Sequence, residues 1–231
     1  MPNTIQGISS MQGVGSIQFI GPNLAMYGSP DAKFNATGST VHNLTSIPAG
    51  ALLVLSTASQ LDTSNNCSVS SSPSLTWTKQ VDPVGSGGSC EIWTAVFEAG
   101  GNIDITSAWI GTTYQSSVCY GFTNQEGTLG GATATGTAQN VPNVNINSTR
   151  ANSYLIAVTG NWNSPDGGSN GASIVWRGSP TQTSYNRSAT DATLVHYYYS
   201  ASTVQSYAVG WTAPNDPDGG GNTAVLEIRG G

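Results

Sequence analysis

The second half of this chain repeats the first half in rewritten form, and this repeat limits the folds open to it. The segment GALLVLSTASQ from Gly50 returns as NSYLIAVTGNW from Asn152, and CEIWTAVF around Trp93 returns as LVHYYYSA around Tyr197. The matching segments keep their order along the chain. Such a repeat predicts two copies of one structural module.

Each copy consists of short segments with the pattern of β-strands. Apolar and β-branched residues alternate with polar ones over short runs, and Gly, Pro, Asn or Ser bounds each run. No segment keeps a helical period. The sequence therefore predicts an all-β protein, an antiparallel β-sandwich or jelly roll built from two pseudo-repeated halves. The expected strands lie near residues 16–20, 40–45, 51–58, 74–80, 91–97, 102–109, 115–122, 141–147, 153–160, 173–178, 193–201, 205–212 and 222–229.

The repeat allows two domain organisations. Two immunoglobulin-like sandwiches in tandem would need a linker, and the segment TLGGATATGTAQN at 128–140 has a flexible composition. We favour a single sandwich made of two half-modules, about 36–127 and 140–231, because a module of about five strands buries too little apolar surface alone. Residues 1–35 have no counterpart in the repeat. We expect an N-terminal arm there, which either adds to a neighbouring subunit or forms an extra strand on its own domain.

The charge of the chain restricts its partners. Only 8% of the 231 residues are charged, the net charge is −6, and the only lysines are Lys33 and Lys79. Binding to a phosphate backbone requires clustered Lys and Arg, so nucleic acid is excluded as a partner. No apolar run reaches the roughly 18 residues of a transmembrane helix. The first residues lack the basic and apolar regions of a signal peptide, which favours assembly in a cytoplasm.

Three cysteines leave one unpaired in any disulfide scheme. Cys67 and Cys90 could bracket the loop before Trp93, with Cys119 free in a strand. The alternative is three free thiols, and the lack of a visible leader favours it.

No set of residues with catalytic spacing is visible. A hydrolase needs a nucleophile with a base, or paired carboxylates in a cleft. The two histidines, His42 and His196, lie in no known motif, and the alternation in LVHYYYSA predicts that His196 faces outward from its strand. We therefore expect a protein that is not an enzyme.

Two acidic, glycine-rich loops are candidates for calcium binding. They are NSPDGGSNG, which contains Asp166, and NDPDGGGN, in which Asp216, Asp218 and Asn222 could supply three oxygen ligands. Pro-Asp-Gly is also the ordinary sequence of a tight turn, which is the alternative interpretation. Apart from calcium, no cofactor is expected.

Trp162 is a candidate for carbohydrate binding, because it lies in the loop GNWNSPDGG where its ring could be exposed for a sugar to stack upon. It could equally cap the end of the sandwich. The other tryptophans fall in expected strands and are expected to pack in the core.

The order and spacing of several motifs resemble a loosely defined group of β-sandwich proteins. The motifs are IPAGALLVLSTAS, SLTWTKQ, GGSCEIWTAVFEAGG, NIDITSAW, VCYGFTNQEG, NSYLIAVTGN and TAVLEIRGG. Members of this group are encoded in bacteriophage and prophage structural regions and in some bacterial surface proteins. The resemblance implies a virion component and transfers no functional residues.

Together these observations predict a non-enzymatic structural protein of a virion, of the capsid-decoration, minor-capsid or head-fibre type. It would act by docking on other subunits, as a homo-oligomer such as a trimer and with other virion proteins. Two alternatives stay open. One is a tail adhesin that binds a receptor or a host-surface glycan, and the other is an extracellular filament subunit whose arm completes a neighbour's sheet.

Overall fold

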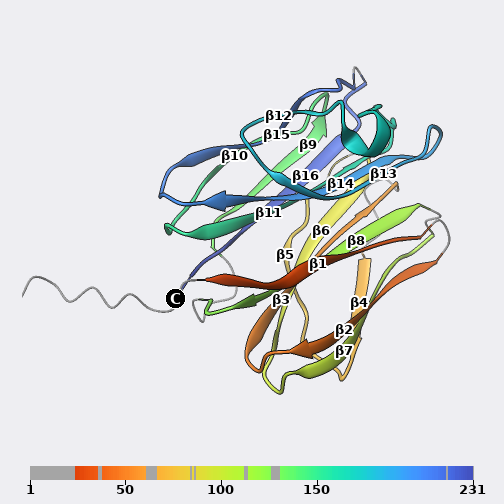
Figure 1. Cartoon of the computed structure of the whole chain (residues 1–231). Coiled ribbons are helices and arrows are strands. Elements are labelled where there is room, and N and C mark those ends of the chain that lie inside the picture. The colour runs from red at the N-terminus through yellow and green to blue at the C-terminus, as the bar shows by residue number, and fades with distance from the viewer. Residues whose placement is uncertain are drawn as a thin grey trace, which may run out of the picture.

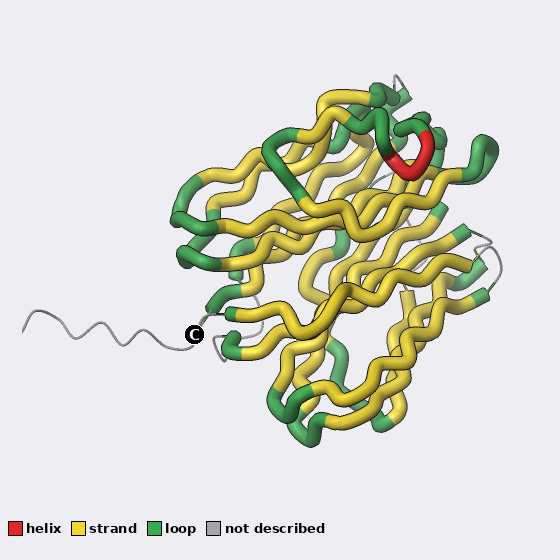
Figure 2. Tube along the Cα trace, in the orientation of Figure 1, coloured by secondary structure: helices red, strands yellow, loops and turns green. Residues whose placement is uncertain are grey.

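The computed structural model describes residues 24–35, 38–60, 67–83, 85, 87–111, 114–125, 131–216 and 218–230. Within these residues the protein is all-β, as the sequence predicts, with sixteen strands, one 3-10 turn at Ser169–Gly171 and no α-helix. Strands make up most of the described chain (Figure 2), and all strand pairs are antiparallel (Figure 1). No helix in this described part of the chain has the length and apolar character needed to cross a membrane.

Eight strands belong to each half of the chain. Module 1 contains β1 (Ala25–Asn35), β2 (Ser39–Ile47), β3 (Ala51–Ser59), β4 (Cys67–Ser72), β5 (Thr78–Val81), β6 (Ser89–Phe97), β7 (Gly101–Trp109) and β8 (Gln115–Thr123). Module 2 contains β9 (Thr133–Gln139), β10 (Asn143–Asn147), β11 (Ser153–Asn161), β12 (Val175–Trp176), β13 (Thr181–Arg187), β14 (Thr193–Ala201), β15 (Ser206–Ala213) and β16 (Gly221–Ile228).

Each module is a sandwich of one five-stranded and one three-stranded sheet. The five-stranded sheets have the orders β1-β8-β3-β6-β5 and β9-β16-β11-β14-β13, and the three-stranded sheets have the orders β2-β7-β4 and β10-β15-β12. Adding eight to every strand number in the sheets of module 1 gives the strand orders of the sheets of module 2. The sequence repeat is therefore a repeat of a complete eight-stranded topology.

The two five-stranded sheets pack face to face, so the molecule has four layers with the three-stranded sheets outermost (Figure 1). Neighbouring residues on one strand serve different cores, because side chains alternate across a sheet. On β3, Val54 lies in the central core between the modules and Leu53 in the core of module 1. On β11, Ile156 lies in the central core and Leu155 in the core of module 2. The centre of the molecule is thus apolar on both faces of its middle sheets.

The contacts between the modules are reciprocal. β1 lies beside β13, and the equivalent strand of module 2, β9, lies beside β5. Likewise β8 approaches β13, and β16 approaches β5. We call the β1/β13 edge of the central core the first seam and the β5/β9 edge the second seam.

The structure corrects the expected domain organisation. Each module has a core of its own, so the chain is not one sandwich closed by two half-modules. The expected number of strands in each half was too low. Eight strands are enough to form the two packed sheets of a sandwich, whereas about five are not. The two modules are not separate tandem domains either, because they share the central core.

For the described part of the expected arm, the structure agrees with the second alternative, an extra strand on its own domain. Residues 25–35 form β1, which pairs with β8 inside module 1, and β9 is its counterpart in module 2. Residues 133–139, expected within a linker, are that strand β9. The expected strand at 16–20 and the rest of the expected arm before residue 24 lie outside the described residues.

Candidate ligand-binding groove between the two modules

A hollow lies at one end of the first seam and takes its walls from both modules. Its volume is about 500 Å³. Module 1 supplies Phe34 and Tyr114, and module 2 supplies the 166–170 loop and the end of β13. We call this hollow the junction groove; its lining residues are Phe34, Tyr114, Asp166, Gly168, Ser169, Asn170, Tyr185, Asn186 and Arg187.

The wall from module 1 is aromatic. Phe34 is the second-last residue of the edge strand β1, and its side chain is 44% exposed. Its ring meets the ring of Tyr114 edge to face, with the ring centroids 4.8 Å apart. Burial, with the charge of Asp191 as the next cause, raises the pKa of Tyr114 to about 12. The groove therefore has an exposed ring held by a second ring, with a neutral hydroxyl at neutral pH.

The wall from module 2 is polar and fixed by hydrogen bonds. The Arg187 Nε donates to the Ser164 carbonyl oxygen at 3.0 Å, and an Arg187 terminal nitrogen lies 3.4 Å from an Asp166 carboxylate oxygen. The Tyr185 hydroxyl accepts a hydrogen bond from the Gly167 N–H at 2.9 Å. Each partner restricts the rotamers of the side chain that it holds, so the polar groups have defined positions.

The groove is balanced in charge and rich in groups that can bind hydroxyls. One carboxylate, Asp166, faces one guanidinium, Arg187, and Asn170 and Asn186 add two amides. Aromatic faces beside a few fixed polar groups are the usual walls of sites for small polar ligands. An uncharged ligand with many hydroxyls fits this combination best.

The equivalent position at the second seam is filled by the chain itself. There, glycines of the loop before β6 pack directly on module 2: a Cβ at Gly87 would lie 2.6 Å from Gly220, and one at Gly88 would lie 2.9 Å from Gly160. The Asn222 side-chain amide donates to the Gly88 carbonyl oxygen at 2.5 Å. The reciprocal packing of the modules thus produces two seams. Among the described residues, the loop before β6 packs on module 2 at the second seam, and the junction groove lies at the first.

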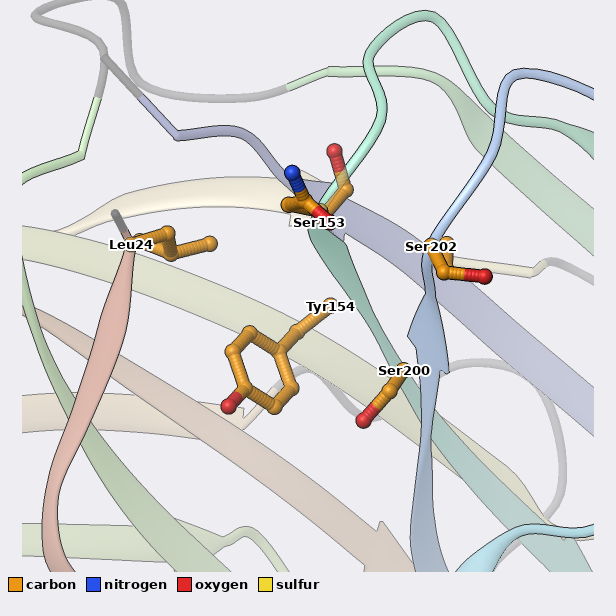
Figure 3. Close-up of a pocket in the computed structure, with 7 residues that line it drawn as sticks. Leu24, Ser153, Tyr154, Ser200 and Ser202 are labelled. Atoms are coloured by element: carbon orange, nitrogen blue, oxygen red, sulfur yellow. The ribbon is translucent and has the colours of Figure 1, made fainter. Parts of the chain in front are cut away.

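A smaller hollow lies at the other end of the first seam (Figure 3). Its volume is about 280 Å³, and the Tyr154 ring forms one wall. None of the described residues that line it is charged. We call it the far hollow; its lining residues are Leu24, Asn152, Ser153, Tyr154, Ser200, Ala201 and Ser202.

Sequence reasoning missed an Asp-His-Ser arrangement inside module 1. His42 Nδ1 lies 3.0 Å from an Asp31 carboxylate oxygen, and His42 Nε2 lies 2.7 Å from the Ser117 Oγ. These are the contacts of a serine-hydrolase triad. However, His42 and Ser117 are fully buried, and the Ser117 Oγ also bonds to the Thr40 Oγ1 at 2.6 Å. The arrangement is therefore a sealed hydrogen-bond network, with no access for a substrate to the serine.

The prediction that His196 faces outward is wrong. His196 is fully buried, with Nδ1 2.7 Å from the Ser56 Oγ and Nε2 2.8 Å from the Ser116 Oγ. As predicted, Val195, Tyr197 and Tyr199 face the core of module 2 and His196 lies on the opposite face of β14. That opposite face is buried because it packs on module 1. Burial, followed by the charge of His42, lowers the pKa of His196 to about 3, so the imidazole is neutral.

The expected calcium site is not formed by these residues. The buried Asp216 carboxylate already accepts hydrogen bonds from the side-chain amides of Asn161 and Asn163 and from the backbone N–H groups of Asp218 and Gly220. These N–H donors present positive hydrogen atoms where a cation would have to lie. The alternative interpretation as a turn describes the loop, with Asp216 as its anchor.

The other residues of the calcium hypothesis are used elsewhere. Asn222 bonds across the second seam through its side-chain amide, which donates to the Gly85 and Gly88 carbonyl oxygens, and its Oδ1 accepts from the Ala138 N–H of its own module at 3.0 Å. Asp166 lies in the junction groove, where it pairs with Arg187. The Asp218 side chain is exposed. In the described part of the chain, no three His, Cys, Asp or Glu residues are grouped to hold a metal ion.

Trp162 is partly exposed, as a carbohydrate platform requires, but it lies outside both hollows. Its side chain is 45% exposed, and it packs over Gly220, where a Cβ would lie 2.4 Å from the indole. It covers the loop that Asp216 anchors. The structure thus gives Trp162 a packing role at the end of module 2, together with an exposed ring face.

The Cys67–Cys90 disulfide is not formed, and all three cysteines are free and buried. Cys90 faces the central core, whereas the next residue, Glu91, faces module 1 and accepts a hydrogen bond from the Cys67 N–H at 3.3 Å. The strand therefore points the Cys90 thiol away from Cys67. Burial, followed by the charge of Glu91, raises the pKa of the Cys67 thiol to about 12.

Comparison of this chain with protein-family models, with curated proteins and with solved structures gave no match. The assignment of function therefore depends on the geometry of the chain itself.

Proposed function

We propose that the chain is a non-enzymatic binding protein that takes an uncharged glycan in the junction groove. The observation that carries the proposal is the position of Phe34, an exposed ring at a groove whose other walls hold two further rings and a fixed Asp-Arg pair. Sugars stack on aromatic faces and use their hydroxyls for hydrogen bonds with carboxylates, amides and guanidinium groups. This corresponds to the adhesin alternative, with a different aromatic residue from the one expected.

A binding role is favoured over a hydrolytic one by the burial of the Asp31-His42-Ser117 network. The Ser117 hydroxyl is held by both Thr40 and His42 and has no exposed surface. An attacking hydroxyl must lie within reach of its substrate.

The test is glycan binding by two variants with matched exposure. Phe34 and Trp162 are 44% and 45% exposed, so Phe34→Ala and Trp162→Ala remove similar apolar surface from different places. We expect Phe34→Ala to lower the affinity at least about tenfold and Trp162→Ala to leave it unchanged, measured by isothermal titration calorimetry on ligands found with a glycan array. Loss of binding only in Trp162→Ala would move the site to that loop, and an array blank for the wild type would refute the proposal.

A virion structural role is a second candidate, favoured by the outer face of module 1. The exposed side chains of β4 are Ser68, Ser70 and Ser72, and β7 and β2 lie in register beside them. Such a face has little charge and suits docking on a neighbouring subunit. The role is compatible with glycan binding, as in a tail adhesin. Light scattering would test the expected homo-oligomer, and mass spectrometry of particles from the source would test virion localisation.

A further inference from the structure

The two hollows of the first seam lie at opposite ends of one strand. Leu24, which lines the far hollow, directly precedes β1, and Phe34, which lines the junction groove, is near its end. Ten residues of extended chain span about 30 Å. This length is several times that of a single sugar ring, so a ligand that reaches both hollows has to be a chain.

A series of aromatic contacts begins at the far hollow and runs through the central core toward β13, with Tyr120 fully buried. The Tyr154 ring of the far hollow contacts the Tyr198 ring at a centroid distance of 5.8 Å, and Tyr198 contacts Tyr120 at 6.4 Å. The Tyr120 hydroxyl lies 3.0 Å from the Thr183 Oγ1 on β13, the strand that also carries Tyr185 of the junction groove. Tyr154 and Tyr198 are only half-buried, at the margin of the central core.

The strands that flank the seam are both edge strands. β1 and β13 each end a five-stranded sheet. An edge strand presents backbone N–H and C=O groups without a partner strand, and hydroxyls of a ligand can bond to them. β13 is half-buried along most of its length, so part of its side-chain surface stays accessible beside the seam.

We propose that the first seam binds a linear, uncharged polysaccharide, with the far hollow as a second subsite. This rests on the proposed function of the junction groove. The far hollow has the matching chemistry, because it offers the Tyr154 ring and the hydroxyls of Ser153, Ser200 and Ser202 without a charge. At the second seam, the described residues of the loop before β6 pack directly on module 2, whereas both hollows described above lie along the first seam.

The experiment compares polymers with short sugars on the intact chain. Affinity gel electrophoresis with hydroxyethylcellulose, laminarin and glucomannan gives the affinity for polymers, and calorimetry with their mono- and disaccharides gives that for the groove alone. Ser200→Trp fills the far hollow from an exposed position, and Ser70→Trp on β4 is the matched control. We expect the wild type to bind one polymer at least about tenfold more tightly than its short sugars.

The variants separate this inference from the proposed function. Ser200→Trp should lower the polymer affinity about tenfold and leave the short-sugar affinity unchanged, whereas Phe34→Ala should lower both. Equal affinity for polymer and short sugar, or full polymer binding by Ser200→Trp, would overturn the second subsite while the groove stands. Failure to bind any saccharide would overturn both proposals.

Discussion

Two buried polar residues of this protein, His196 and Glu227, have their hydrogen bonds provided by neighbouring groups. His196 lies in the central core with one serine hydroxyl for each ring nitrogen, Ser56 from β3 and Ser116 from β8. Glu227 is buried in module 2. Burial would raise its pKa, but hydrogen bonds from Ala132, Thr149 and Arg150 outweigh this and lower it. Buried polar groups with partners cost little, and they fix the register of the packed sheets.

The neutral state of His196 predicts a dependence of stability on pH. The folded-state pKa is about 3, and the unfolded value is 6.5. The unfolded state therefore takes up the proton first, and the free energy of unfolding falls as pH drops from 6.5 toward 3, by about 1.4 kcal/mol per pH unit for this group. His196→Gln should have a shallower slope in urea unfolding between pH 6.5 and 5. His42 contributes equally to both proteins, so equal slopes would contradict a neutral, buried imidazole.

Asp216 predicts stability that does not depend on calcium. Because its carboxylate is saturated by N–H donors, neither calcium nor a chelator should change the Tm of the wild type. Asp216→Ala should lower the free energy of unfolding by about 2–4 kcal/mol, because it leaves several buried N–H groups without an acceptor. Thermal unfolding followed by circular dichroism checks both. A rise in Tm with calcium that Asp216→Ala abolishes would restore the metal site.

Among the elements, the loop before β6 has the tightest contacts across the two modules. Gly87 has φ of +112° and no room for a Cβ against Gly220, whereas Gly111 has φ of +76° and open space around it. An alanine would be strained at both positions by the positive φ, but only at Gly87 would its Cβ also clash with backbone atoms, those of Gly220.

Alanine substitutions at these two glycines separate strain from packing. Gly111→Ala should cost about 1–2 kcal/mol of unfolding free energy, the penalty of the left-handed conformation. Gly87→Ala should cost a further 1–3 kcal/mol or so, because the loop must shift off module 2. Denaturant unfolding measures the difference. An equal loss of unfolding free energy in the two variants would show that this loop does not pack tightly on module 2.

The elements at the sheet centres could all be predicted from the sequence, whereas only half of the edge strands could. β3 is buried at every residue, so its apolar run predicts a strand directly. The strands missed, β1, β4, β9 and β13, are all edge strands, in which small and polar residues face both sides and no apolar period appears.

The candidate groove was missed for the same reason. Phe34 lies on β1, and Tyr185 and Arg187 lie on β13, so the site is built from edge strands. Of the residues that line the groove, the sequence indicates only Asp166 as a candidate site residue, and for calcium binding. Whether two distant edges meet depends on how the modules pack, and a single sequence does not carry that information in its local pattern.

For the whole molecule, the shared central core predicts that the two modules unfold together. Separation would expose one apolar face on each five-stranded sheet, including Val54 and Phe122 on one and Ile156 and Leu226 on the other. We expect one calorimetric transition whose van't Hoff enthalpy equals the calorimetric enthalpy. Two resolved transitions would mean that each module is stable with this face in water. Leu226→Ala should lower the temperature of the whole transition and not broaden it into two.

The reciprocal contact of the two seams is what a dimer of identical subunits would show across a two-fold axis, where the same patch serves both partners. The chain can thus be understood as a dimer whose subunits became joined by gene duplication and fusion. Joining frees the two copies from identity, so the described residues of the two seams can differ, with a packed loop at one and a groove at the other. An unpaired groove of this kind is open to a joined chain, since a symmetric dimer repeats every site that lies off its axis.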